Sequence, residues 1–209
     1  MRTAGIDLHG ISQRFKYIGT NKLHMKHNSY IDYKREVILA LLRGENHVRA
    51  IAKLINTNHM TVSRTLKLLR LQNVLDYREE GKNKVYFFKT GAEARVAINM
   101  AEQYKLTRTL EKYPELRLLI EEIQRDQKIK LAILFGSYAK GLAKEGSDID
   151  IYIESEDQSI KQKLKILDAR ASVKLGKYDA DNTLIKEIDK NHVIIKGVEK
   201  YYEKQKLFA

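Results

Sequence analysis

Two aspartates one residue apart stand in a run of isoleucines within FGSYAKGLAKEGSDIDIYI, residues 135–153. Apolar and polar residues alternate over SDIDIYIE, which is typical of a β-strand with one buried face. Asp148, Asp150 and Tyr152 would then share the face opposite the isoleucines, an open face bordering a cleft. The Cα atoms of Asp148 and Asp150 would lie about 6.6 Å apart, at ~3.3 Å per residue, so both carboxylates could reach one magnesium ion. Solvated aspartates on a surface strand would give the same pattern.

A glycine-serine pair, Gly136-Ser137, comes shortly before the aspartates and directly after the apolar run IKLAILF, residues 129–135. That run is consistent with a buried strand, and the following YAKGLAK reads as a short helix. Glycine lets the backbone approach a ligand closely, and the free N–H groups of a helix N-terminus attract anions. A phosphate site beside a metal site is what phosphoryl transfer needs, since the protein contributes mainly positioning and charge neutralisation. The Gly-Ser pair alone also fits an ordinary tight turn.

The combination of FGSYAKG with SDIDIYI resembles the minimal nucleotidyltransferases of the DNA polymerase β superfamily. The resemblance is specific over residues 129–155 and looser over 114–203. It implies that Asp148 and Asp150 are catalytic and bind magnesium, and that Gly136 and Ser137 hold nucleotide phosphates. It also implies transfer of a nucleoside monophosphate from a nucleoside triphosphate to a hydroxyl.

One position departs from this family, which usually has a third carboxylate on a later strand. In SVKLGKY, residues 172–178, the expected aspartate corresponds to Lys174. A lysine would compete with a metal or contact a phosphate, and Asp179 or Asp181 could substitute if the strand register differs. The ending HVIIKGVEKYYE resembles the family's usual last segment at the sheet edge. His192, Tyr201 and Tyr202 within it are interpreted as structural.

Positive charge is concentrated in the first part of the chain. Residues 1–90 hold 17 Lys and Arg against 7 Asp and Glu, whereas residues 91–209 hold 22 against 20. This asymmetry indicates a polyanion as a partner for the first part, although a basic surface without a partner would look the same.

Helical spacing of apolar residues recurs between residues 31 and 71. The first expected helix, 31–43, carries Val37, Ile38, Leu41 and Leu42 and ends at Gly44. The second, 48–55, would turn Ile51, Leu54 and Ile55 inward. The third, from His59 to Leu71, would turn Val62, Leu66 and Leu69 inward. The segments VLDYREE and KVYFFKT flank Gly81-Lys82-Asn83 and predict a β-hairpin.

Three helices and a hairpin in this order resemble a winged helix-turn-helix domain over residues 30–90. Such a recognition helix presents short polar and basic side chains to the major groove of double-stranded DNA. Lysines at the hairpin tip would neutralise phosphates. The predicted DNA-binding residues are Thr61, Ser63, Arg64, Lys67, Lys82 and Lys84. Winged helices also serve as protein–protein and dimerisation modules.

The remaining segments predict how the two parts are connected. Residues 1–29 form a basic N-terminal extension, which is either a nucleic-acid-binding arm or a segment upstream of a natural start at Met25 rather than Met1. Residues 91–113 read as a connecting helix with Ala94, Ala97, Ile98, Ala101 and Leu110 on its apolar side. Pro114 suits the first turn of a further helix, PELRLLIEEIQRD.

The composition of the chain excludes several kinds of functional site and segment. The chain has 209 residues and no cysteine, which excludes disulfides, thiolate metal sites and cysteine nucleophiles. No apolar run is long enough to span a membrane or to act as a signal peptide, so a cytoplasmic location is expected.

These features predict an α+β protein with an N-terminal winged helix-turn-helix domain and a polymerase-β-like nucleotidyltransferase domain over 114–209. The latter would have a small mixed sheet and flanking helices. The predicted function is a magnesium-dependent nucleotidyltransferase that binds DNA. The alternative is a DNA-binding transcriptional regulator, or an antitoxin-like protein, whose transferase domain is degenerate. A partner protein and a homodimer are both compatible with the sequence, and the acceptor and the nucleotide are not specified by it.

Overall fold

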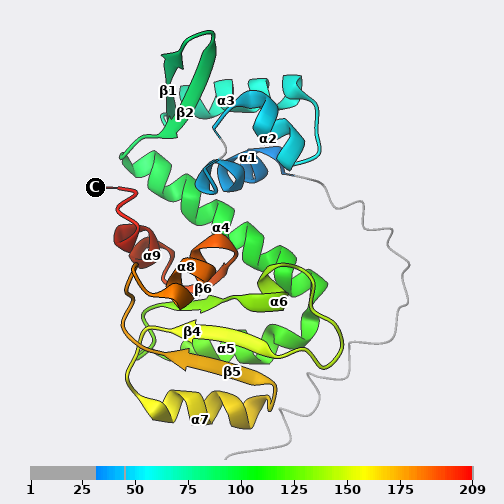
Figure 1. Ribbon diagram of the computed structural model, residues 1–209, viewed down its shortest axis with the longest axis vertical. Helices are drawn as coiled ribbons and strands as arrows, with labels where there is room; N and C mark the ends of the chain where they lie inside the picture. Colours follow the sequence, from blue (N-terminus) through cyan, green and yellow to red (C-terminus); the bar gives the residue numbers. More distant parts are fainter. Residues whose placement is uncertain (1–31, 45, 209) are drawn as a thin grey trace, which may run out of the picture. The chain divides into compact units, whose positions relative to one another are not determined.

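The computed structural model describes residues 32–44 and 46–208 (Figure 1). The predicted N-terminal extension, and the choice between Met1 and Met25 as the start, lie outside the described residues. From Asp32 onward the described residues pack together as one unit.

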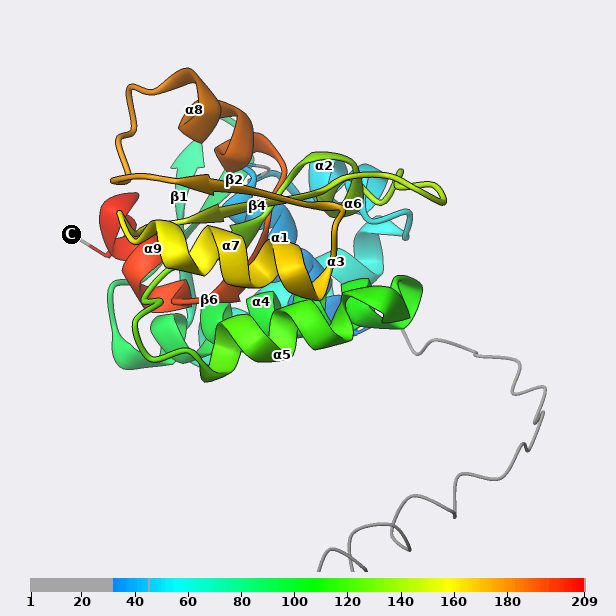
Figure 2. The same ribbon diagram turned by 90° about the horizontal axis from the view of Figure 1, so that it is seen from below.

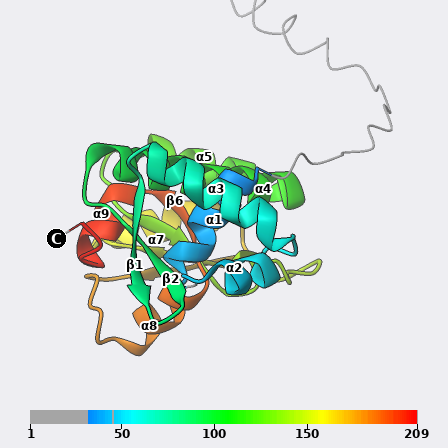
Figure 3. The same ribbon diagram turned by 90° about the horizontal axis from the view of Figure 1, so that it is seen from above.

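The three helices and the hairpin expected over residues 31–90 are present. They are α1 (Tyr33–Leu42), α2 (Val48–Leu54), α3 (His59–Leu71), β1 (Leu75–Glu80) and β2 (Asn83–Phe88). Figure 3 views these elements from above. Asp32 starts α1 by accepting bonds from the backbone N–H groups of Lys34 and Arg35, and Asn58 starts α3 by accepting from Thr61 N–H at 2.8 Å. After α1, Gly44 has φ +94°, a left-handed conformation that favours glycine.

Burial confirms most of the expected inward positions. Val62, Leu66 and Leu69 of α3 are fully buried. The expectation for Leu54 was wrong, because its side chain is 44% exposed and Ala52 takes the buried place beside Ile51. Helix α2 has only seven residues. Its buried side contains Ile51, Ala52 and the half-buried Ile55, and Leu54 lies outside that side.

Helix α4 (Ala92–Lys112) connects the first elements to the rest of the chain. Its buried side chains Ala94, Ala97, Ile98 and Ala101 belong to one apolar cluster with α1 and α3, and Leu106 belongs to a second cluster around the later sheet. The helix packs on α1 and on β6 (Val193–Lys196), between which it lies in Figure 1. Leu110, expected on the apolar side, is half-buried. The turn η1 (Pro114–Leu116) then leads into α5 (Arg117–Arg125).

A mixed four-stranded sheet forms the centre of the C-terminal part, as expected. Its strands are β3 (Ala132–Leu134), β4 (Ile149–Ile153), β5 (Ala171–Leu175) and β6, in the order β5-β4-β3-β6. Strand β4 is parallel to β5, whereas β3 is antiparallel to both β4 and β6. The C-terminal segment therefore supplies an edge strand.

Each face of the sheet has its own apolar cluster. Ile149, Ile151 and Ile153 lie on the face covered by α5 and α7 (Gln158–Leu167), which Figure 2 shows from below. The other face carries Ile133, Tyr152 and Ile194 and packs against α8 (Thr183–Lys190), α9 (Val198–Lys204) and α4. The complete burial of the isoleucines confirms that their face of β4 belongs to the core.

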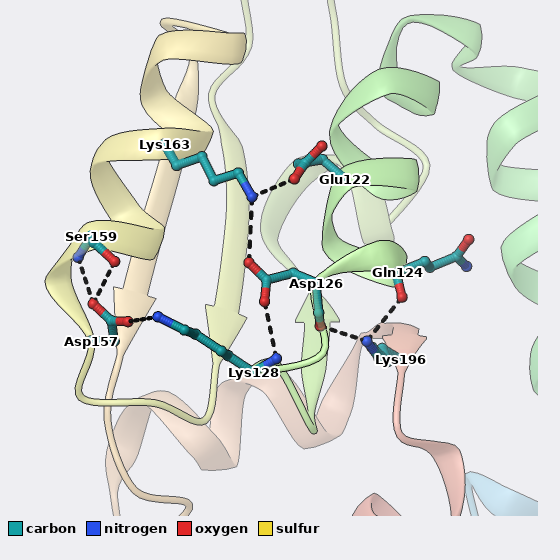
Figure 4. A network of polar contacts seen from close by, with 8 residues as sticks. All are labelled: Glu122, Gln124, Asp126, Lys128, Asp157, Ser159, Lys163 and Lys196. Atoms are coloured by element: carbon teal, nitrogen blue, oxygen red, sulfur yellow. Dashed lines mark hydrogen bonds and ion pairs between the residues drawn. The ribbon is translucent and has the colours of Figure 1, made fainter. Parts of the chain in front are cut away.

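A polar network fastens α5, α7 and β6 at one end of the sheet (Figure 4). The Lys196 ammonium donates to the carbonyl oxygens of Gln124 and Asp126 at 2.9 and 2.7 Å. Gln124 lies in the last turn of α5 and Asp126 directly follows the helix, so neither carbonyl has a partner within it, although that of Asp126 also accepts from Ile129 N–H at 3.2 Å. Lys163 of α7 contacts Glu122 at 2.5 Å and Asp126 at 3.5 Å.

Candidate active site

The two aspartates lie at the start of β4. Asp150 is the second residue of the strand and is half-buried, whereas Asp148 precedes the strand and is exposed. The backbone of Asp150 is held by Phe135, whose N–H donates to the Asp150 carbonyl at 2.9 Å. This bond continues the β3–β4 ladder up to the Gly-Ser turn, so the turn and the aspartates lie next to each other.

Gly136 makes the closest approach in this site. Its φ is +67°, and a Cβ atom built on it would overlap Oδ2 of Asp150 and lie 3.1 Å from the Asp150 Cγ. The left-handed conformation therefore favours glycine here, and a larger residue would have to displace the Asp150 carboxylate. Ser137 follows and is half-buried, and its carbonyl accepts a bond from Leu142 N–H at 2.9 Å.

The short helix after the turn differs from the expectation. It was expected over YAKGLAK but forms α6 at Gly136–Ala139, so the Gly-Ser pair lies inside its first turn. A loop then continues to β4, with Gly141 at φ +71° and Gly146 at φ +80°. With only four residues, α6 contributes little helix dipole, so the predicted phosphate site would depend on the local backbone N–H groups.

The expectation of one open face for Asp148, Asp150 and Tyr152 was wrong at Tyr152. This side chain is 2% exposed, packs edge-on against Tyr178 and donates from its hydroxyl to the Gly176 carbonyl at 2.9 Å. Burial raises the pKa of the Tyr152 hydroxyl above its ordinary value. The reason is that α8 and α9 cover this face, which leaves only the start of β4 accessible.

No third carboxylate joins the aspartate pair among the residues that the structure describes. The β4–β5 register places Ser172 beside Asp150 and the exposed Lys174 beside Tyr152. Asp179 and Asp181 follow β5, whose last residue pairs with Ile153 at the opposite end of β4 from Asp148. Within residues 32–44 and 46–208, no three His, Cys, Asp or Glu side chains are grouped so that they could hold a metal ion.

Arg170 is a neighbour of the site that the sequence interpretation missed. Its carbonyl accepts from Ile149 N–H at 2.9 Å, directly after Asp148. Its guanidinium bonds to Asp168 at 2.7 Å and approaches the Tyr138 hydroxyl of α6 at 3.4 Å. Hydrogen bonding from Arg170 lowers the pKa of the Asp168 carboxyl. Arg170 immediately precedes β5, and that position was the only signal for it in the sequence.

The predicted recognition residues share one side of α3. Ser63, Arg64 and Lys67 are exposed, opposite the buried Val62, Leu66 and Leu69. Thr61 is half-buried, and its backbone takes part in the N-terminal cap of α3.

The hairpin is less basic at its tip than expected. Lys82 lies in the exposed turn, but Lys84 lies within β2 opposite Glu79, with its ammonium 4.1 Å from the ring centroid of Tyr77. Arg70 of α3 contacts the same ring, with its guanidinium carbon at 4.3 Å. The hairpin residues balance in charge, with three acids (Asp76, Glu79, Glu80) and three bases (Arg78, Lys82, Lys84).

The aromatic residues near the C-terminus have the structural place expected of them. Tyr201 and Tyr202 are buried and donate to Asp189 at 2.9 Å and to Glu102 at 2.7 Å, respectively. The His192 ring packs against that of Tyr201, with centroids 4.8 Å apart and planes tilted by 53°.

Comparison with known proteins agrees with the fold of the C-terminal part. Residues 116–206 match the family model described as nucleotidyltransferase domain, and the match supports such a domain there. It covers the sheet, the Gly-Ser turn and both aspartates. None of the curated proteins searched matches the chain. Among the described residues, no helix is long and apolar enough to cross a membrane.

Proposed function

We propose that the protein is a magnesium-dependent nucleotidyltransferase that carries a DNA-binding winged helix-turn-helix domain. The observation that carries this proposal is the close approach of Gly136 to the Asp150 carboxylate, inside a segment that matches the nucleotidyltransferase domain. Because Gly136 has no side chain, a phosphate chain can lie against its backbone. The same phosphates could then reach a metal ion held by the two neighbouring carboxylates.

The residues at the start of β4 fit a magnesium ion. Mg²⁺ is commonly bound by one or two carboxylates together with substrate phosphates and waters, so the pair Asp148 and Asp150 is a sufficient protein contribution. When bound, the ion would neutralise the triphosphate and favour departure of pyrophosphate. The N–H groups at Gly136 and Ser137 would orient the phosphates.

The DNA-binding part of the proposal rests on α3. Its exposed side carries Ser63, Arg64 and Lys67, while its other side is fixed in the core by three buried residues. A rigid helix with polar and basic side chains on its exposed side fits the major groove of duplex DNA. Because the hairpin carries balanced charge, α3 would contribute more of the phosphate attraction than the wing. A cytoplasmic location, a homodimer and a partner protein stay predictions.

A second candidate function is favoured by the missing carboxylate. Ser172 lies beside Asp150 where an acidic group would complete a metal and base site, and Lys174 lies further along the same strand, beside Tyr152. A DNA-binding regulator or antitoxin-like protein with a non-catalytic transferase domain would need no such group.

Label transfer separates the two functions. The full chain would be incubated with each nucleoside triphosphate labelled on the α-phosphate, with magnesium, and with itself, duplex DNA or candidate proteins as acceptor. Covalent label that disappears in Asp148→Asn/Asp150→Asn supports the transferase. Binding of nucleotide without any transfer supports the regulator.

A further inference from the structure

A cleft with a polar floor lies between α1, α4, α6 and the C-terminal elements. It consists of a cavity of about 200 Å³ and a neighbouring one of about 260 Å³, which share Leu39, Arg43, Lys105 and Ala139 as lining residues. One water molecule occupies roughly 30 Å³, so either cavity has room for a small ligand. Asp148 and Asp150 line neither cavity.

Two residues that line the first cavity each have a buried acceptor atom with no hydrogen-bond partner among the described residues. One is Oε2 of Glu102, a residue that is 1% exposed and whose other oxygen accepts from Tyr202. Lys105 forms an ion pair with Oε2 at 3.7 Å, a separation beyond the range of a hydrogen bond. Leaving a buried carboxylate oxygen without a hydrogen-bond donor costs free energy. A ligand that supplies such a donor would therefore be stabilised here.

The second atom is Nε2 of His192. Nδ1 of this ring lies 3.1 Å from the Ile188 carbonyl, which can only accept, so Nδ1 carries the proton and Nε2 is an acceptor. Burial, together with the nearby Lys105 charge, lowers the pKa of His192 to about 3. The ring is therefore neutral near pH 7.

The rim of the cleft is positively charged. The two cavities are lined by six basic side chains (Arg43, Lys105, Arg108, Lys112, Lys140, Lys190) and three acidic ones (Glu36, Glu102, Asp189). Three of the basic side chains are in ion pairs, Arg108 with Glu36, Lys105 with Glu102 and Lys140 with Glu187, and Asp189 accepts from Tyr201. Arg43, Lys112 and Lys190 are the other three. The surplus of cations suits an anionic group at the rim.

We propose that this cleft binds a nucleotide, with phosphates at the basic rim and the N–H or O–H donors of the base and sugar on Glu102 and His192. A phosphorylated ligand that also carries hydrogen-bond donors would pair with the basic side chains of the rim and with the two buried acceptors. Inorganic phosphate would pair only with the basic side chains. Arg43 directly follows α1, and Lys140 directly follows α6. Occupancy would therefore connect the first three helices with the segment that holds the Gly-Ser turn.

The test uses full-length Asp148→Asn/Asp150→Asn protein without magnesium, so that binding at the aspartate pair does not contribute. ATP, GTP and inorganic phosphate would each be titrated by calorimetry. We expect one nucleotide to bind more tightly than phosphate, at least tenfold weaker binding after Arg43→Ala/Lys112→Ala, and weaker binding after the near-isosteric Glu102→Gln. The control Lys161→Ala/Lys165→Ala removes the same charge from exposed positions of α7.

Two results would overturn the proposal. One is the absence of binding by either nucleotide at millimolar concentration, or binding no tighter than that of inorganic phosphate. The other is an equal loss of affinity in the rim variant and in the α7 control, since that would be a general charge effect. Because the measurement excludes magnesium and the aspartate pair, failure here leaves the proposed transferase untouched.

Discussion

Gly136 and Asp150, fourteen positions apart, are in such close contact that the glycine has no space for a methyl group. The glycine backbone is left-handed at φ +67°, and the carboxylate next to it comes from the neighbouring strand β4. The turn and the strand thus constrain each other, and a change in either is expected to displace the other.

Gly136→Ala is expected to weaken binding of nucleoside triphosphate by tenfold or more, because the methyl group displaces the Asp150 carboxylate. Gly146→Ala is the matched control, since Gly146 has φ +80° but nothing within 4 Å of a built Cβ. Both variants should lose about 1–2 kcal/mol from left-handed strain. Nucleotide titration with magnesium separates them, and equal affinity of the two variants would contradict the role of the close approach.

Asp148→Asn/Asp150→Asn is expected to remove magnesium-dependent nucleotide binding while the protein stays folded. Amides are poor replacements for two anionic ligands of a hard cation. The isoleucines that build the core lie on the other side of β4. Thermal unfolding should therefore match the wild type in the absence of metal. If nucleotide titrations with magnesium give the same affinity for both proteins, the aspartates do not hold the metal.

Arg64→Ala/Lys67→Ala is expected to weaken duplex DNA binding. It should also flatten the salt dependence by up to about one unit of log–log slope for each phosphate that the variant no longer neutralises. Removing Arg64 should relax sequence preference as well. Lys82→Ala/Lys84→Ala should have a smaller effect, because Lys84 packs on Tyr77 and faces Glu79. If a variant with all four substitutions binds duplex DNA as tightly as the wild type at moderate salt, this surface does not contact DNA.

Lys196→Met is expected to lower the free energy of unfolding by about 1–3 kcal/mol, because two carbonyls that end α5 are deprived of a charged donor. Lys161→Met, at an exposed position of α7, is the control and should change stability by less than ~0.5 kcal/mol. Urea unfolding monitored by circular dichroism measures both. Similar values for the two variants would show that water replaces the ammonium without cost.

His192 is expected to make the protein less stable as the pH falls. Its pKa is about 3 when folded against an ordinary value of 6.5, so between these values the unfolded chain binds a proton that the folded chain does not. Stability should decrease on acidification from about pH 6.5 toward pH 3, with a slope approaching ~1.4 kcal/mol per pH unit. His192→Gln should reduce this slope, which chemical unfolding between pH 4 and pH 8 would reveal. An unchanged slope would show that His192 is accessible to protons in the folded state.

Local patterns predicted most of the fold. The i, i+4, i+7 spacing of Val62, Leu66 and Leu69 gave the correct side of α3, and the alternation around Ile149 gave the correct face of β4. Leu54 was assigned wrongly because a helix of two turns allows more than one apolar side. The sequence predicted a phosphate site at Gly136-Ser137 beside the aspartates, but the contact between Gly136 and Asp150 comes from the structure.

Local sequence patterns could not predict the features that depend on contacts between segments far apart in the chain. The register that brings Ser172, and not Lys174, beside Asp150 depends on how β5 docks along β4. The burial of Tyr152 depends on α8 and α9, which follow it by about 30 residues or more in the sequence. Charged groups buried between elements, such as Glu102 with Tyr202, carry no local signal either.

Helix α4 sets a practical limit on dividing this chain. Its residues Ala94 to Ala101 complete the cluster around α1, while Glu102 receives the hydroxyl of Tyr202 from α9. A fragment beginning at Pro114 would uncover β6 and leave Tyr202 without its acceptor, and a fragment ending at residue 90 would uncover α1. Each half would need its own copy of the helix, so a transplanted N-terminal half is expected to fold well only when it ends after Lys112, and a transplanted C-terminal half only when it begins before Ala92.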